Sequence, residues 1–209
     1  MSTPSAVEAP PRGRLPEREL SAEFLRLRED ALVWIGDYYD GEHLRRSADW
    51  LLAVEPEASE PLALAVLTHD MERTVPGGPV LDKARTAWDD PDYNRRHCDR
   101  SAVVVAGWLR EREAPEYFVR GVKVPIQEHE FGGSPEGDLA QAADSLSWLE
   151  VNSPLALSWV ENGECDLAKA EAKLDWMLAR IRIERAREPA ARLHEQAMAR
   201  LRAGVARLQ

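Results

Sequence analysis

The feature that most constrains this chain is a short apolar run that ends in a histidine and an aspartate. Residues Leu62–Thr68 read Leu-Ala-Leu-Ala-Val-Leu-Thr, and His69 and Asp70 follow directly. A helix that is apolar nearly all round is buried in a core, so this one would carry an imidazole and a carboxylate into the interior. Burying a carboxylate without a partner is very costly. A bound metal ion would satisfy both side chains.

Further candidate ligands occur before and after this pair. His43 precedes it, and His97, His129 and Asp144 follow it, so that four of the five histidines belong to the series. Four imidazoles and two carboxylates suffice for two transition-metal ions, with the aspartate of the pair as a bridge. Such ligands suit iron, manganese, zinc, cobalt or nickel, and we expect two divalent ions, with iron or manganese as the first candidates. The fifth histidine, His194, has charged neighbours and is expected at the surface.

Length and composition indicate a globular protein of one domain. The chain has 209 residues, of which 44% are hydrophobic, which is enough to bury a core without disulfides. The formal charge of −10 argues against a nucleic-acid partner but allows an anionic small molecule at a metal centre. Cys98 and Cys165 have no spacing typical of a metal site or a disulfide framework, so we expect free thiols. The sequence shows neither a signal peptide nor a membrane-spanning stretch, which predicts a cytoplasmic protein.

Apolar spacing and the positions of Pro and Gly predict an all-α fold. Residues 1–18 carry four prolines and few apolar residues, which is typical of a disordered tail. A helical bundle is expected over residues 19–163, with helices over residues 164–209 that pack on it or form a homodimer contact. The first predicted helix is capped by Ser21. The others span about 41–54, 61–72, 91–113, 115–131, 138–151, 164–184 and 188–208.

Four stretches of the sequence resemble the HD superfamily of metal-dependent phosphohydrolases, an all-helical fold named after its His-Asp pair. The stretches are Glu42–Leu44, Leu67–Glu72, Gln127–Gly133 and Ala143–Ser147. The resemblance extends from His43 to Asn152 and would make residues 19–163 the HD domain. It implies that one metal ion is held in the minimal pattern of the family and a second by the two additional histidines of the extended pattern. The minimal pattern falls on His43, His69, Asp70 and Asp144, and the additional histidines are His97 and His129.

Two activities are compatible with this resemblance. Dinuclear members of the superfamily include cyclic-dinucleotide phosphodiesterases of the HD-GYP type and mixed-valence diiron oxygenases related to myo-inositol oxygenase. The sequence lacks the long GYP signature, and Glu128 rather than a second histidine precedes His129, which argues against the HD-GYP group. The first hypothesis is a hydrolase that attacks a small phosphorylated metabolite, a phosphomonoester or nucleotide, with a metal-activated water. The alternative is a diiron oxygenase of a small polar or anionic substrate.

The hydrolase hypothesis assigns roles to further residues. Asp70 is the central catalytic ligand, and Glu72 resembles the acidic residue that orients the water in nucleotidase members of the superfamily. Asp144 and Val151 share one face of the predicted helix, and Asn152, the next residue, can reach the mouth of the pocket. Candidate contacts to the phosphate are Arg73, Arg95, Arg96 and Lys173. Each of these cations can equally lie on a solvated face, and Glu72 can simply pair with Arg73. In the oxygenase hypothesis, Arg73 would hold the anionic substrate.

Overall fold

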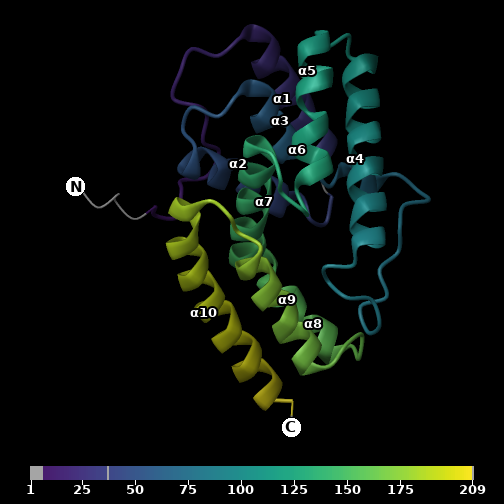
Figure 1. Ribbon diagram of the computed structural model, residues 1–209, viewed down its shortest axis with the longest axis vertical. Coiled ribbons are helices and arrows are strands. Elements are labelled where there is room, and N and C mark those ends of the chain that lie inside the picture. The colour runs from purple at the N-terminus through teal and green to yellow at the C-terminus, as the bar shows by residue number, and fades with distance from the viewer. Residues whose placement is uncertain (1–6, 37, 209) are drawn as a thin grey trace.

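The protein is helical throughout the part of the chain that the structure describes. The computed structural model describes residues 7–36 and 38–208, and no strand occurs among them. The prediction of an all-α fold is confirmed (Figure 1). The elements in chain order are α1 (Ala22–Ile35), α2 (Gly41–Val54), α3 (Glu60–Thr68), η1 (Met71–Thr74), α4 (Pro91–Glu111), α5 (Glu116–Gly121), α6 (Lys123–Glu128), α7 (Pro135–Ser147), η2 (Trp148–Asn152), α8 (Ser153–Glu161), α9 (Leu167–Ala179) and α10 (Glu184–Ala206).

Polar side chains cap several of these helices, as the sequence indicates. The hydroxyl of Ser21 accepts a hydrogen bond from the Phe24 amide at the start of α1, and Ser59 does the same for Leu62 at the start of α3. The carboxylate of Asp90 caps α4 in the same way. Each cap satisfies an amide group that has no acceptor within its own helix.

Some predicted boundaries were wrong. Helix α3 ends at Thr68, and the predicted continuation to residue 72 is a separate turn of 3-10 helix, η1. At this point the side chain of His69 binds the Val66 carbonyl, which a backbone amide would bind if the helix continued. The predicted break near residue 188 does not occur, since α10 runs through Pro189. This proline lies near the start of the helix, where its missing amide removes a single hydrogen bond.

Helix α3 forms the centre of the molecule. It packs against α1, α2, α5, α6 and α7, and its residues Leu62–Thr68 are all buried. The expectation from its apolar sequence is therefore confirmed, and the reason is that it has neighbours on every side. The residues that follow α3 consequently begin inside the protein, and residues 69–72 are all buried.

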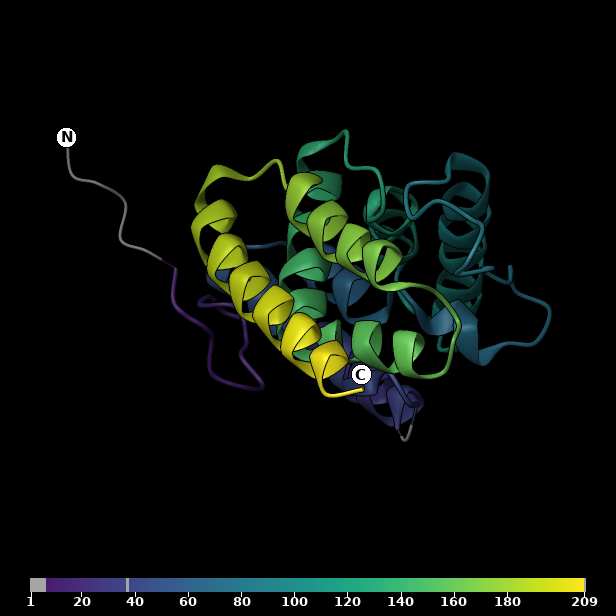
Figure 2. The same ribbon diagram turned by 90° about the horizontal axis from the view of Figure 1, so that it is seen from below.

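The C-terminal helices form a second layer on this bundle. Helix α10 packs on α7, η2, α8 and α9, and α9 in turn contacts α7 and η2. Figure 2 shows α8, α9 and α10 together on one side of the molecule. The layer covers η2, which is one turn of π-helix directly after α7. Such turns are frequent at functional sites.

The described part of the N-terminal segment lies against the bundle without forming a helix. The amide of Arg14 donates to the Asp49 carboxylate at 2.8 Å, and the buried Arg46 side chain donates to the Pro10 carbonyl at 3.1 Å. The sequence predicts disorder for residues 1–18, whereas residues 7–18 make these defined contacts. Residues 1–6 lie outside the described part of the chain. The contacts arise because buried polar groups on α2 require partners.

The core can be tested with two substitutions on the same helix. Leu27 on α1 is fully buried, whereas Val33 on the same helix is 75% exposed. Replacing Leu27 with alanine leaves a cavity and should lower the free energy of unfolding by about 3 kcal/mol. Val33→Ala should change it by less than about 0.5 kcal/mol. Urea unfolding followed by circular dichroism measures both, and equal effects would contradict the assigned packing of α1.

Candidate metal centre

Asp70 lies where α3 gives way to η1, and three imidazoles surround it. Its Oδ1 atom is 2.8 Å from Nε2 of His97, 3.7 Å from Nε2 of His129 and 4.0 Å from Nε2 of His69. All four side chains are buried. One carboxylate oxygen thus faces three potential ligand nitrogens, which is an arrangement that a bridging ligand requires.

The other two predicted ligands complete the cluster. Oδ1 of Asp144 is 3.1 Å from Nε2 of His43 and 3.7 Å from Nε2 of His69. Among the described residues, two groups have ligand atoms close enough to hold a metal ion, and they share Asp70. The groups are His43, His69 and Asp70, and Asp70, His97 and His129. The structure therefore brings all six predicted ligands together, from α2, α4, α7 and the ends of α3 and α6.

The four imidazoles share one orientation. In each, Nδ1 is hydrogen-bonded to an oxygen behind the ring. The partners are the Val66 carbonyl for His69 at 2.8 Å, the Ile126 carbonyl for His129 at 2.6 Å, the Ser147 hydroxyl for His43 at 2.9 Å and the Glu72 carboxylate for His97 at 2.9 Å. An Nδ1–H that donates in this way leaves Nε2 as the coordinating atom, as is usual for metal-bound histidine.

A local motif explains two of these orientations. His69 and His129 each lie directly after the last residue of a helix, and each binds the carbonyl three residues before it. The last carbonyls of a helix have no amide partner within it. A histidine in this position therefore satisfies a free carbonyl and at the same time presents Nε2 beyond the helix end.

The chemistry of the donors fits a metal ion. Nε2 of His129 is buried and has no hydrogen-bond partner among the described residues. Burial, together with the nearby His69 and His97, lowers the pKa of His129 to about 4, so this nitrogen keeps a free lone pair at neutral pH. A buried acceptor without a partner is costly. Coordination of a cation would satisfy it, and the hydrogen bond behind the ring would not need to change.

The pKa of His69 is raised, whereas that of His129 is lowered. Burial disfavours its protonation, but the carboxylates of Asp70 and Asp144 outweigh burial and raise the pKa of His69 to about 9. A proton between imidazole and carboxylate balances the negative charge that a metal ion would otherwise balance. Binding of a metal ion would therefore displace a proton at this position.

Two arginines hold the outer oxygens of the two aspartates. Nε of Arg73 donates to Oδ2 of Asp70 at 3.0 Å, and Arg180 donates to Oδ2 of Asp144. Burial would raise the pKa of both carboxyls, but the paired arginine and the neighbouring histidines together outweigh burial, and each pKa lies well below its ordinary value. Both aspartates are therefore ionised and direct Oδ1 toward the histidines.

Glu72 was predicted to orient a water, and the structure places it elsewhere. Its side chain is 1% exposed and lies behind His97, where Oε1 accepts from Nδ1 and Oε2 accepts from Nε of Arg100 at 2.9 Å. The role that this position allows is to orient His97. Spacing along the chain could not show this, because η1 turns the side chain of Glu72 away from that of Asp70.

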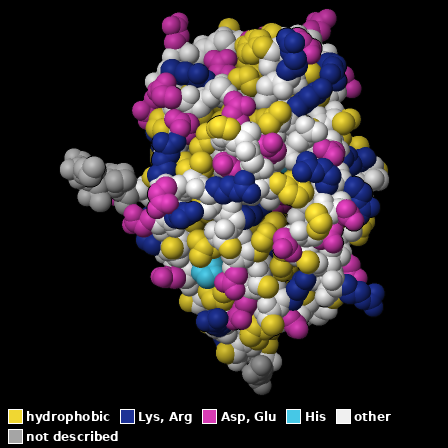
Figure 3. Space-filling view, viewed as in Figure 1, with side chains coloured by type: hydrophobic (Ala, Val, Ile, Leu, Met, Phe, Trp, Pro, Cys, Tyr) yellow, Lys and Arg dark blue, Asp and Glu magenta, His cyan; other side chains and the backbone are white. Residues whose placement is uncertain are grey.

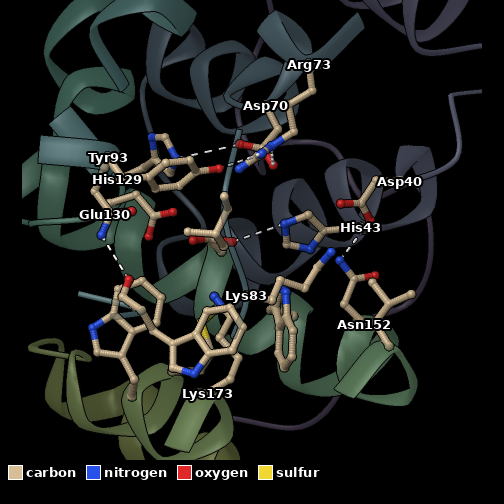
Figure 4. A pocket seen from close by; sticks show the side chains of 18 of the residues that line it. Asp40, His43, Asp70, Arg73, Lys83, Tyr93, His129, Glu130, Asn152 and Lys173 are labelled. Carbon is tan, nitrogen blue, oxygen red and sulfur yellow. Dashed lines mark hydrogen bonds and ion pairs between the residues drawn. The ribbon is translucent and has the colours of Figure 1, made fainter. Parts of the chain in front are cut away.

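Four of the six candidate ligands line the end of a pocket of about 370 Å³ (Figure 4): His43, Asp70, His129 and Asp144. Of the predicted substrate contacts, Arg73, Asn152 and Lys173 line this pocket. Arg95 and Arg96 do not, which corrects their prediction. Arg95 lies over the ring of Phe131, and Arg96 donates to a carbonyl of its own helix. Both are exposed because they point outward from the face of α4 that carries His97.

Of the residues that α9 contributes to the pocket, only Lys173 was predicted from the sequence. Arg180, directly after α9, was not among the predicted site residues, yet it is buried and donates to Asp144 and Glu130. The sequence does contain a pattern that could have identified this side of the pocket. Four residues at helical spacing form one face along α9 and line the pocket. They are Lys173, Trp176, Met177 and Arg180. Such spacing places side chains on one face of a helix.

Comparison with known proteins does not identify a relative. No family model matches the chain, and no match to it was found among curated proteins or solved structures. Within the described residues, no helix is both long and apolar enough to cross a lipid bilayer. The function of the protein must therefore be inferred from the geometry of the site.

The first prediction of this geometry concerns metal content. The purified protein should bind about two metal ions per chain, one for each ligand group, with iron or manganese as the principal metals. Elemental analysis after loading with each metal measures the ratio. Absence of metal under every loading condition would contradict the site. A single ion at metal excess would assign His97 and His129 to substrate instead.

The second prediction concerns the shared ligand. Asp70→Ala should abolish metal binding in both groups, because a methyl group cannot bridge two cations. His194→Ala is the control, since His194 lies on α10 and pairs with Asp175 at 2.8 Å rather than with the cluster. It should bind as much metal as the unmodified protein. An Asp70→Ala variant that retains both ions would refute the placement of the centre.

Proposed function

We propose that this protein is a metal-dependent hydrolase of the HD type that acts on a small phosphorylated metabolite, a phosphomonoester or a nucleotide. The observation that carries the proposal is that two ligand groups share Asp70 at the end of a pocket that also contains cationic side chains. The order of His43, His69, Asp70 and Asp144 along the chain supports the HD assignment. The all-α fold is compatible with this assignment.

The ligand groups define what metal ions would do here. One ion would be held by His43, His69, Asp70 and Asp144, and the other by Asp70, His97 and His129. When bound, such ions supply Lewis acidity toward a phosphate oxygen and lower the pKa of a water nucleophile toward neutrality. The protein orients the ligands for this task through the Nδ1 hydrogen bonds and through Arg73 and Arg180.

The remaining pocket residues suit a phosphate group. Arg73 is at the ligand end of the pocket, where its guanidinium contacts Asp70 and also donates to the Tyr93 hydroxyl at 3.2 Å. A guanidinium offers five donors in a planar fork, so that donors remain for phosphate oxygens. Charge on these oxygens increases during hydrolysis, and a fixed guanidinium next to them stabilises it.

Size and charge favour a small substrate. A volume of about 370 Å³ lies at the lower end of the range for small-molecule pockets. The chain carries a formal charge of −10, and on the face shown in Figure 3 basic and acidic side chains are interspersed. A long polyanion needs many basic contacts. A single phosphate needs the metal centre and one or two cations.

A diiron oxygenase is the second candidate. Its support is the number of imidazoles, since four histidines with two carboxylates also suit a pair of iron ions. The hydrolase is preferred because Glu130 and Phe131, rather than a lysine, follow His129, and because Glu130 is itself engaged by Arg180. A substrate-binding lysine close after this ligand is common in such oxygenases.

One experiment separates the two activities. The protein loaded with manganese, iron or cobalt is incubated with a panel of phosphorylated metabolites while released phosphate and dissolved oxygen are followed together. We expect phosphate release from at least one ester without oxygen uptake, and loss of that release in Asp70→Ala. Oxygen uptake coupled to product, with no phosphate released from any ester, would overturn the hydrolase and favour the oxygenase.

A further inference from the structure

Lys173 on α9 lies in a cage of tryptophan rings within the same pocket. Its Nζ atom is 4.3 Å from the ring centre of Trp176, 4.9 Å from that of Trp148 and 5.5 Å from that of Trp88. Cation–π contacts at these distances hold an ammonium group in place. The three rings come from α9, η2 and the loop before α4, so the cage forms only in the folded protein.

Other side chains already contact the faces of these tryptophan rings. Trp88 stacks on Trp159 with ring centres 5.3 Å apart, and the guanidinium of Arg180 lies 4.4 Å from the ring centre of Trp176. Lys173 itself covers a part of each ring in its cage. A planar base that enters the pocket would have to displace these contacts. A ligand on this side of the pocket would therefore meet the ammonium group of Lys173 and not an open aromatic face.

The other cations of the pocket already have carboxylate partners. Arg73 is paired with Asp70, Arg180 with Asp144 and Glu130, and Lys83 with Glu164 at 2.6 Å. Within the described chain, Nζ of Lys173 forms no hydrogen bond or ion pair with another residue. An ammonium group has three donors, and aromatic rings cannot accept them as a carboxylate does. Burial lowers the pKa of Lys173 to about 8, so most molecules still carry this charge at pH 7.

We propose that Lys173 binds a second anionic group of the substrate, so that the enzyme acts on a small phosphoester that also carries a carboxylate or another phosphate. This inference rests on the proposed function, which places the first phosphate at the ligand end of the pocket. Figure 4 shows Lys173 on the side of the pocket away from Asp70 and Arg73. A ligand with negative groups at both ends would contact the metal centre and Lys173 together.

The test measures binding and does not depend on turnover. Isothermal titration calorimetry on the manganese-loaded protein compares methylphosphonate, which has one anionic group, with 3-phosphonopropionate and propane-1,3-diphosphonate, which have two. We expect at least one of the two-ended compounds to bind about ten- to a hundredfold more tightly than methylphosphonate, as a charged hydrogen bond implies. The compound that shows the gain identifies the second group as carboxylate or phosphate.

The variants assign this gain to Lys173. Lys173→Met should abolish it, because methionine fills the cage and packs well on aromatic rings but has no charge. Lys173→Arg should retain part of it. Lys169→Met is the matched control: Lys169 lies one turn earlier on α9 and 5.2 Å from the ring centre of Trp88, but its Nζ donates to the Thr86 carbonyl and it does not line the pocket. This control should keep the full gain.

Several outcomes would overturn the inference. They are equal affinity of all three compounds for the unmodified protein, or a gain that survives in a Lys173→Met variant whose thermal unfolding shows it to be folded. A comparable gain in affinity for benzylphosphonate that survives Lys173→Met would instead identify the tryptophan cage as a site for an aromatic group. If the metabolite panel releases no phosphate while the Lys173-dependent gain is observed, the hydrolase proposal fails and the anion site stands.

Discussion

The burial of Asp70 and Asp144 is the constraint on which the rest of the structure depends. Two ionised carboxylates inside a helical bundle require positive charge close by, because desolvation of an unpaired carboxylate would cost more than a typical core contact contributes. The protein supplies part of this charge through Arg73 and Arg180, each bound to the outer oxygen of one aspartate. The inner oxygens face histidine nitrogens, where a metal ion would provide the rest.

The helices are arranged so that this cluster forms away from water. Helix α3 is enclosed by five other helices, and Asp70 lies two residues after its end, so the carboxylate is buried in the bundle. Helix ends also help to form the cluster, because free carbonyls at the ends of α3 and α6 orient His69 and His129. The same unsatisfied groups that end a helix thereby orient two candidate ligands for a metal ion.

Not all of the predicted residues lie in the site. The six ligands were predictable because imidazoles and carboxylates in apolar surroundings have few other uses. Glu72 was assigned from its resemblance to a residue of nucleotidase members, and Arg95 and Arg96 were assigned as cations that could contact phosphate; neither argument fixes the direction of a side chain. Glu72 lies behind His97 and the two arginines point outward, since a change of one residue rotates a helical side chain by about 100°.

The sequence by itself determined the fold class, most helix positions and which side chains could serve as metal ligands. These depend on local spacing, on caps such as Ser21 and on the cost of burying charge, all of which can be judged along the chain. Only the tertiary structure decided which helix closes the pocket. The tryptophan cage around Lys173 and the contact of Arg180 with Asp144 join residues that are far apart in the chain. Their meeting depends on how α9 packs on α7 and η2, and no local pattern specifies that packing.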